Sequence, residues 1–369
     1  MRIDRRVAIR RSILVASVGW LWARACIAVG FVVAHAAQSG SRSATLDQGL
    51  LSWDSAFYLN LARDGYAGSP PDAVRFFPLY PTLGKAFSPI FGGREDIALV
   101  VLSNIGALVG AALLWHLASE TFGGSDTATP TLADRAAIAI AIVPPAFVFA
   151  FAYTEGIALA FVAATLLALT RRSWFWVGIW AALAAASRPI GGLVLVPILV
   201  ELIRVRPRPS PGRIVAAVLG PLLGFAAAML WIYRETSDLF APVDAQAVLR
   251  SDLRNPIVRC LEAVWALFHD NYTDIENVPF IVLWALLVIV SIQRRQPWSW
   301  IALSVVTLVL ATSAQTLDSL GRYGMLAVPL VIALAQWADR RWRQVLVAVL
   351  GSAGVTWMTA AVLLDQIVP

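Results

Sequence analysis

Residues 52–66, SWDSAFYLNLARDGY, place one carboxylate among aromatic side chains. Asp54 follows Trp53, and Asp54 and Tyr58 are four residues apart, so that both lie on one face of a helix. A carboxylate in such a setting can accept a proton as a general base. The same residues have a purely structural explanation, because Trp and Tyr concentrate at membrane interfaces and an acidic residue favours a helix N-terminus. The local sequence alone does not separate these two interpretations.

The spacing predicts a short amphipathic helix over residues 52–66 that lies on the outer membrane surface. Ser52 is a suitable N-cap, apolar residues recur at helical spacing, and Gly65 is expected to end the helix. The segment 75–81, RFFPLYP, is aromatic and broken by proline, and we expect it to return the chain to the membrane.

The elements that must position these residues are membrane spans. The chain has 369 residues, of which 59% are hydrophobic and 14% are charged, and these values exclude a soluble globular protein. We predict an all-α, single polytopic membrane domain over 1–369 with about eleven transmembrane helices, within a range of 10 to 13. The predicted spans are 12–37, 97–118, 134–152, 154–170, 174–187, 190–204, 214–233, 278–293, 298–313, 322–338 and 343–364.

The charges predict the orientation of these spans. The run 12–37 is too long for a signal-peptide core, so we expect an uncleaved first helix with a cytoplasmic N-terminus. This topology places 17 of the 29 Lys and Arg residues inside and 17 of the 23 acidic residues outside. Topology and anionic membrane lipids therefore account for the net charge of +6, and we expect no nucleic-acid partner. A single Lys85 against 28 arginines suggests a GC-rich bacterial genome, and hence a multi-pass protein of the plasma membrane.

Two long segments lie outside in this topology, a first external loop at 38–96 and a second external segment at 234–277. Several spans are interrupted by proline, at Pro144 and Pro145, at Pro189 and at Pro197. Broken backbone at membrane depth is tolerated where it is buried or lines a cavity. The breaks therefore predict a cavity that opens outward.

The order of several short motifs resembles a known family. Residues 53–66 and the FFPLYP run at 76–81 are similar to the first luminal loop of the glycosylphosphatidylinositol mannosyltransferase II (PIG-V) family and its prokaryotic relatives. Later landmarks follow in the family's order, and they are Tyr153-Thr154-Glu155, Ser187-Arg188-Pro189, Arg322-Tyr323 and Pro329. The chain departs from the pattern at Tyr80, where Phe is usual, and at Ser52, where a basic residue is common, and it is shorter than the eukaryotic members. The identity of the acceptor is therefore not carried over.

The resemblance implies a GT-C-type glycosyltransferase. Such an enzyme takes a sugar, here expected to be mannose, from a polyprenyl-phosphate donor and transfers it with inversion to a lipid, glycan or protein acceptor hydroxyl on the non-cytoplasmic face. One carboxylate is sufficient for this reaction, because phosphate leaves without a general acid. Asp54 is the expected catalytic base.

The leaving phosphate requires a cation, and guanidinium can bind phosphate through two hydrogen bonds. Arg188 and Arg322 are the better candidates for the donor phosphate, followed by Arg75, although each could instead be a topological anchor, and Arg188 could pair with Glu155. The side chains expected to contact substrate are Trp53, Tyr58, Phe77, Tyr153, Glu155 and Tyr323. Interfacial aromatic residues and a helix-starting acid are the alternatives for this set.

Other chemistries lack a motif in this sequence. It contains no Walker loop, no Rossmann glycine pattern and no G-x-S-x-G, and its histidines, His35, His116 and His269, are scattered. The acidic stretches 95–96 and 270–276 are more simply explained as solvated loops than as cation sites. We therefore expect no metal and no cofactor, and a lipid-linked rather than a nucleotide-linked donor.

A membrane transporter or flippase for a lipid-linked or anionic substrate is the competing function. Transporters usually place ionisable residues near the bilayer midplane and are often built from two repeated halves. In this sequence the charges lie at the predicted outer rim, and the two external segments differ in pattern. The transferase is therefore favoured.

Overall fold

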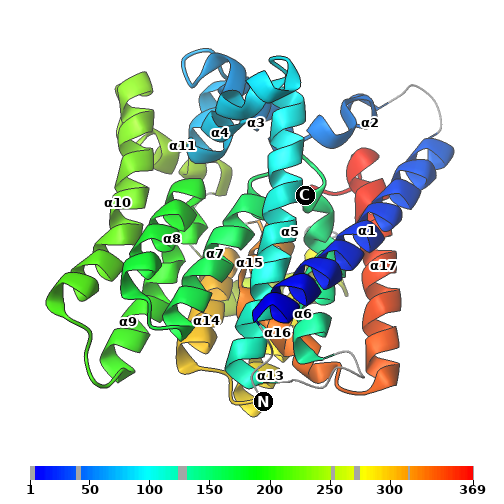
Figure 1. The fold of residues 1–369 in the computed structure, drawn as a ribbon. Coiled ribbons are helices and arrows are strands. Elements are labelled where there is room, and N and C mark those ends of the chain that lie inside the picture. The colour runs from blue at the N-terminus through cyan, green and yellow to red at the C-terminus, as the bar shows by residue number, and fades with distance from the viewer. Residues whose placement is uncertain are drawn as a thin grey trace.

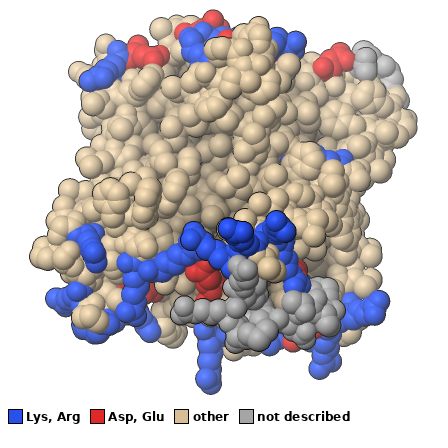
Figure 2. Space-filling model, viewed as in Figure 1, with Lys and Arg blue, Asp and Glu red and all other residues tan. Residues whose placement is uncertain are grey.

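The computed structural model describes residues 5–38, 43–123, 131–250, 254–269, 275–314 and 316–368. Helices dominate these segments, which contain no β-strand. On the face drawn in Figure 2, a broad and largely uncharged band separates two charged ends, and Lys and Arg are concentrated at the lower one. The predicted all-α, polytopic membrane architecture is confirmed.

Four helices in the described segments are long and apolar enough to cross a membrane. They are α1 (Arg5–Ala37), α5 (Glu95–Phe122), α10 (Pro211–Thr236) and α17 (Arg341–Leu363). Shorter apolar helices also occur, namely α7 (Glu155–Thr170), α8 (Trp174–Ser187), α13 (Val278–Gln293) and α14 (Trp298–Thr312). The expected number of about eleven spans stays a prediction, because length and composition alone do not decide which of the short helices cross the membrane.

Three predicted spans are not continuous helices. The first, 134–152, is α6 (Leu132–Ile142) followed by a 3-10 segment, η4 (Pro144–Phe149), and the second, 190–204, is η5 (Pro189–Val194) followed by α9 (Leu195–Arg204). The third consists of α15 (Leu320–Leu326) and α16 (Val328–Trp337), which meet at an angle of 81°. Pro144, Pro197 and Pro329 lie in the first turn after these breaks, and Pro189 begins η5, as expected for a residue that supplies no backbone N–H and fits best in a first helical turn.

The buried helix α7 lies between α5 and α8 in the bundle, while α1 crosses α5 and α6 and packs against α17 (Figure 1). Glycine allows the closest of these contacts. A Cβ on Gly156 of α7 would lie 2.1 Å from the Ser103 carbonyl oxygen of α5, and one on Gly220 of α10 would lie 2.1 Å from the Gly178 carbonyl oxygen of α8. Any side chain at either position would therefore push the two helices of the pair apart.

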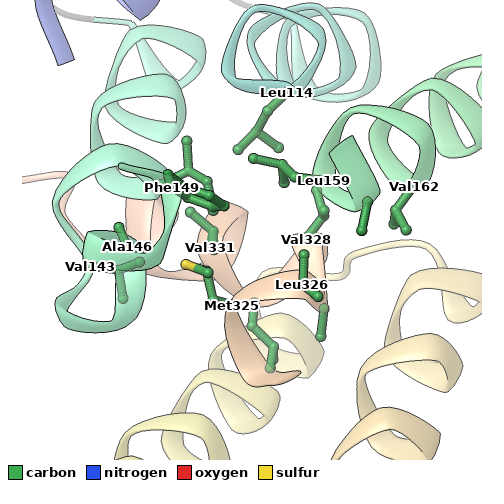
Figure 3. Close-up of a cluster of buried hydrophobic side chains, with 14 of the residues drawn as sticks. Leu114, Val143, Ala146, Phe149, Leu159, Val162, Met325, Leu326, Val328 and Val331 are labelled. Carbon is green, nitrogen blue, oxygen red and sulfur yellow. The ribbon is translucent and has the colours of Figure 1, made fainter. Parts of the chain in front are cut away.

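An apolar core joins the elements that carry Glu155 and Arg322. Figure 3 shows Leu114 of α5, Leu159 of α7, Phe149 of η4 and Val328 of α16 meeting in one buried cluster. Loss of one such side chain would leave a cavity and cost about 2–5 kcal/mol. This packing fixes where the neighbouring polar residues lie.

The described part of the predicted external loop, residues 43–96, folds into short helices at the end of the bundle opposite the N-terminus (Figure 1). These are α2 (Ala44–Gln48), η1 (Gly49–Leu51), α3 (Asp54–Asp64), η2 (Pro71–Arg75), α4 (Leu79–Phe87) and η3 (Ser88–Phe91). The second segment, 234–277, begins in the last turn of α10 and contains α11 (Ala241–Arg250), α12 (Pro256–Ala266) and η6 (Ile275–Asn277).

Candidate active site

The start of α3 differs from the sequence prediction. Trp53, not Ser52, is the N-cap residue, and its φ of 57° lies in the left-handed region. The Ser52 hydroxyl donates to the Gly49 carbonyl oxygen at 2.9 Å instead of capping α3. The Trp53 indole N–H reaches the Val362 carbonyl oxygen of α17 at 3.1 Å, so a tertiary contact accompanies this unusual conformation. Gly65 ends the helix with φ 68°, as predicted.

Helix α3 is packed into the protein by one face. Tyr58 is only 3% exposed and makes edge contacts with Phe76 and with Tyr80 of α4, in each case with ring centroids 5.0 Å apart. Burial raises the pKa of Tyr58 well above the usual value of a phenol. The phenol therefore stays neutral near neutral pH and cannot serve as the base there.

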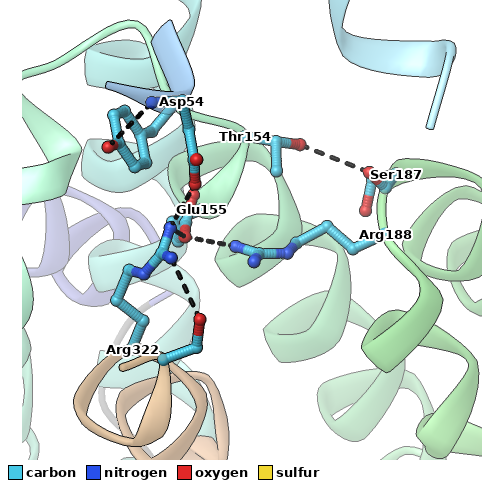
Figure 4. A network of polar contacts seen from close by, with 8 residues as sticks. Asp54, Thr154, Glu155, Ser187, Arg188 and Arg322 are labelled. Carbon is cyan, nitrogen blue, oxygen red and sulfur yellow. Dashed lines mark hydrogen bonds and ion pairs between the residues drawn. The ribbon is translucent and has the colours of Figure 1, made fainter. Parts of the chain in front are cut away.

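Four charged side chains from distant parts of the sequence, Asp54 among them, meet at the start of α3 (Figure 4). Arg322 Nη1 lies 2.8 Å from Asp54 Oδ2 and 3.0 Å from Glu155 Oε1. Arg188 forms an ion pair with the same Glu155 oxygen. Two carboxylates and two guanidiniums thus form one network of zero formal charge, which reduces the cost of burying them.

Exposure decreases from Asp54 into the network. The Asp54 side chain is 23% exposed, whereas Arg188 and Arg322 are 11% and 8% exposed and Glu155 is 1% exposed. Glu155 Oε2 and Arg322 Nε have no hydrogen-bond partner among the described residues. Asp54 therefore marks the accessible side of the network, and the buried side retains unused donor and acceptor capacity.

Aromatic rings flank both arginines. The Arg322 guanidinium lies over the Tyr153 ring at 5.5 Å, and that of Arg188 lies over the Tyr323 ring at 5.7 Å. Tyr153 is fully buried, and its hydroxyl oxygen accepts a hydrogen bond of 3.3 Å from the Asp54 backbone N–H. Tyr153 thus contacts both the first residue of α3 and the arginine that Asp54 binds.

Two predicted site residues make their contacts elsewhere. Arg75 lies over the rings of Phe57 and Phe76 and is 3.8 Å from Asp72. Phe77 is 1% exposed and packs against Phe225 of α10, with ring centroids 5.4 Å apart. The structure therefore does not bring Arg75 or Phe77 into the charged network, because the packing around the 43–96 segment holds both elsewhere.

Hydroxyl residues within or next to the predicted motifs hold the network in place. The Thr154 hydroxyl donates to the Ser187 carbonyl oxygen at 3.4 Å, which connects the start of α7 to the end of α8 (Figure 4). Arg322 Nη2 donates to the Ser319 hydroxyl at 3.1 Å. The sequence landmarks include Thr154 and Ser187 but assign them no role, and Ser319 was not singled out at all; its only signal was proximity to Arg322 along the chain.

Within the described residues, no three His, Cys, Asp or Glu side chains gather to hold a metal ion. Most of the acidic stretch 270–276 lies outside the described residues, which resume at 275. Metal independence therefore stays a prediction for this protein.

No family model matches the sequence, and neither does any curated protein. The structure is similar to the crystal structure of ArnT from Cupriavidus metallidurans bound to undecaprenyl phosphate, with a TM-score of 0.54 and 14% sequence identity. The chain has the fold of ArnT. The similarity covers 85% of this chain and 59% of the ArnT chain, so this chain spans less than two thirds of the length of ArnT. The predicted all-α membrane fold is confirmed, and this fold is similar to that of ArnT.

An oligosaccharyltransferase from Archaeoglobus fulgidus, tethered to an acceptor peptide, is a more distant structural match. Its TM-score is 0.45 with 12% identity, over 94% of this chain and 56% of the other. At 14% identity, the similarity to ArnT describes the fold alone.

Proposed function

We propose that this protein is a membrane glycosyltransferase that moves a sugar from a polyprenyl-phosphate donor to an acceptor hydroxyl, with Asp54 as the catalytic base. The observation that supports this proposal most directly is the position of Asp54 at the accessible side of a buried network of Arg322, Glu155 and Arg188. ArnT, which has the same fold, was solved with undecaprenyl phosphate, and this supports a lipid phosphate as donor.

The reaction balances with one carboxylate. An acceptor oxygen forms a bond to the anomeric carbon while the bond from that carbon to the phosphate oxygen breaks, and the acceptor proton passes to Asp54. Attack opposite to the leaving group inverts the anomeric configuration. The electron pair leaves with the phosphate, so no acid is required on that side.

The arginines stabilise the phosphate that leaves. Arg188 and Arg322 are held by Glu155 through a single carboxylate oxygen, while Arg322 Nε is unpartnered. A phosphate that approaches Arg322 competes with Asp54 for this guanidinium, and binding of the donor thereby frees the Asp54 carboxylate for the acceptor proton. Glu155 then positions both arginines rather than contacting the reacting atoms.

The proposal also specifies the sugar, the acceptor and the membrane face on which the reaction takes place. Similarity to the PIG-V family motifs supports mannose and an inverting reaction. The excess of arginine at the end of the molecule opposite α3 supports a site on the non-cytoplasmic face of a plasma membrane. The acceptor is a lipid, a glycan or a protein hydroxyl.

The test measures transfer of radiolabelled sugar from polyprenyl-phosphate mannose to endogenous acceptors in membranes that contain the full-length protein. Asp54→Asn keeps the size of the side chain and removes the base, so we expect transfer to fall by about 10²–10⁴-fold. Asp64→Asn is the matched control, because Asp64 is an exposed acid at the other end of α3. We expect it to keep wild-type activity.

Size-exclusion chromatography checks that each variant is folded. Full transfer by folded Asp54→Asn would remove Asp54 as the base while leaving the transferase in place. If folded wild-type protein transfers no label from any polyprenyl-phosphate sugar in the presence of suitable acceptors, the transporter becomes the better interpretation.

A further inference from the structure

A polar cleft of about 600 Å³ lies at the end of α7 away from Glu155. Its wall includes Leu169 and Thr170 from the last turn of α7, and α7 has 16 residues, which corresponds to about 24 Å along the helix axis. The cleft is therefore separated from the candidate active site by the length of a helix. It is formed between the ends of α5, α7, α9, α13 and the start of α14.

Four charged residues line this cleft, and three of them are arginines. They are Arg172, Arg204, Arg295 and Glu201. Glu201 accepts a hydrogen bond of 2.5 Å from the Ser299 hydroxyl, which connects α9 to α14. None of the three arginines has an ion pair within the described part of the chain. The cleft therefore carries an uncompensated positive charge.

Two of these arginines follow another arginine in the sequence, and the two members of each Arg-Arg pair make different contacts. Arg171 pairs with Glu120 at 2.5 Å, and Arg294 pairs with Asp339 at 2.7 Å, whereas the next residues, Arg172 and Arg295, line the cleft. Arg172 and Arg295 also have φ values of 55° and 52°, in the left-handed region that non-glycine residues avoid. The first arginine of each pair is used by the fold, and the second is turned to the cleft.

Buried polar atoms without partners provide a second and independent observation. Gln296 is buried, with only 3% of the residue exposed, and its Oε1 has no hydrogen-bond partner among the described residues. The Thr121 hydroxyl is buried and lacks a partner in the same way. Both residues line the cleft. Such atoms are costly to leave unpaired, so a ligand that supplies a hydroxyl and an acceptor oxygen would satisfy them.

The border of the cleft is apolar and suited to a lipid. Trp298 is 56% exposed and Ile292 is 50% exposed, and both belong to the lining. Exposed Trp at the end of a membrane helix is typical of the interfacial region, where lipid headgroups lie. A phosphate in the cleft can thus be continuous with acyl chains outside it.

We propose that this cleft binds the phosphate and the headgroup hydroxyl of an anionic phospholipid, on the membrane face opposite Asp54. The three arginines bind the phosphate, and Gln296 Oε1 accepts from the headgroup hydroxyl. Helix C-termini and topology also favour arginine at these positions, but they leave Gln296 and Thr121 unpartnered. The proposal does not depend on the glycosyltransferase reaction.

The test uses the purified full-length protein in detergent, with phosphatidylglycerol or phosphatidylcholine added, and counts retained lipid by native mass spectrometry. We expect one saturable phosphatidylglycerol, and a loss of binding on the order of 100-fold in the triple variant Arg172→Gln, Arg204→Gln, Arg295→Gln. The control removes three exposed arginines that do not line the cleft, through Arg10→Gln, Arg208→Gln and Arg213→Gln. This control is expected to retain the lipid.

Equal loss of lipid in both triple variants would overturn the proposal, because general charge would then explain binding. Retention of phosphatidylcholine to the same extent as phosphatidylglycerol would also overturn the proposal, because the cleft would then not select an anionic headgroup. Displacement of the lipid by inorganic phosphate at similar concentration would reduce the cleft to an anion site. If the triple variant does not fold, Thr121→Val removes one hydroxyl with little change in shape, and it is expected to weaken phosphatidylglycerol binding selectively.

Discussion

At the scale of single residues, Arg322 determines how the candidate active site is held. One Nη1 atom contacts both Asp54 and Glu155, while Nη2 contacts Ser319. Planar guanidinium can reach several oxygens in fixed directions, whereas the ammonium group of lysine is a single point. The identity of this residue therefore matters beyond its charge.

We predict that Arg322→Lys keeps a folded protein but lowers sugar transfer by about 100-fold, because the charge is retained and the geometry is lost. Arg75→Lys is the control, since Arg75 contacts aromatic rings outside the network. Initial transfer rates measured at saturating donor report the effect. Unchanged rates in folded Arg322→Lys would show that charge alone is required.

The sequence predicts which residues form the candidate site, but it does not predict which of them contact one another. Asp54, Glu155, Arg188 and Arg322 were all candidates, and the structure brings all four together. Their pairing spans 268 residues between Asp54 and Arg322, and no local pattern encodes such a distance. Arg75 and Phe77 carried the same kind of signal, but packing holds them elsewhere.

At the scale of elements, the break between α8 and η5 places Arg188. Arg188 has extended backbone dihedrals, and its carbonyl oxygen accepts from the Gly191 N–H at 3.0 Å. A Cβ on Gly191 would lie 1.9 Å from the Ala184 carbonyl oxygen, whereas a Cβ on Gly192 would meet nothing within 4 Å. The turn after Arg188 therefore requires glycine at position 191 but leaves room for a side chain at position 192.

We expect Gly191→Ala to displace η5 from α8, to lower the melting temperature and to reduce transfer at least about tenfold, because Arg188 moves away from Glu155. Gly192→Ala is expected to behave as wild type. Thermal unfolding in detergent and transfer assays on both variants measure the difference. Similar melting temperatures and rates for the two variants would contradict this account of the turn.

The ends of the long helices were predicted closely, except that α1 begins at Arg5 rather than at residue 12. Hydropathy and span length depend on composition, whereas the charged first turns of α1 lie outside the apolar run. The breaks at proline were anticipated, but the 81° bend between α15 and α16 was not, because it depends on how Leu326 and Val328 pack against other helices. The N-cap at Trp53 was also missed. A left-handed tryptophan is disfavoured locally and is accompanied here by a contact with Val362, which is remote in sequence.

At the scale of the whole molecule, the two sites lie at opposite ends of α7, one neutral and one positive. The network at Asp54 pairs two acids with two arginines, whereas the cleft at Arg172 has three arginines and Glu201. Positive residues are retained on the cytoplasmic side of membrane proteins. This asymmetry predicts that Asp54 faces outward and Arg172 faces the cytoplasm.

Labelling of introduced cysteines tests this orientation. In a protein with Cys26 and Cys260 replaced by serine, we expect Asp64→Cys, at the exposed end of α3, to react with a membrane-impermeant maleimide added to intact cells. Arg208→Cys, in the exposed loop after α9, is expected to react only after the membrane is permeabilised. The reverse pattern would place Asp54 on the cytoplasmic side and would exclude a reaction on the outer face. It would also move the lipid cleft to the outer leaflet, where the same three arginines would oppose the positive-inside rule.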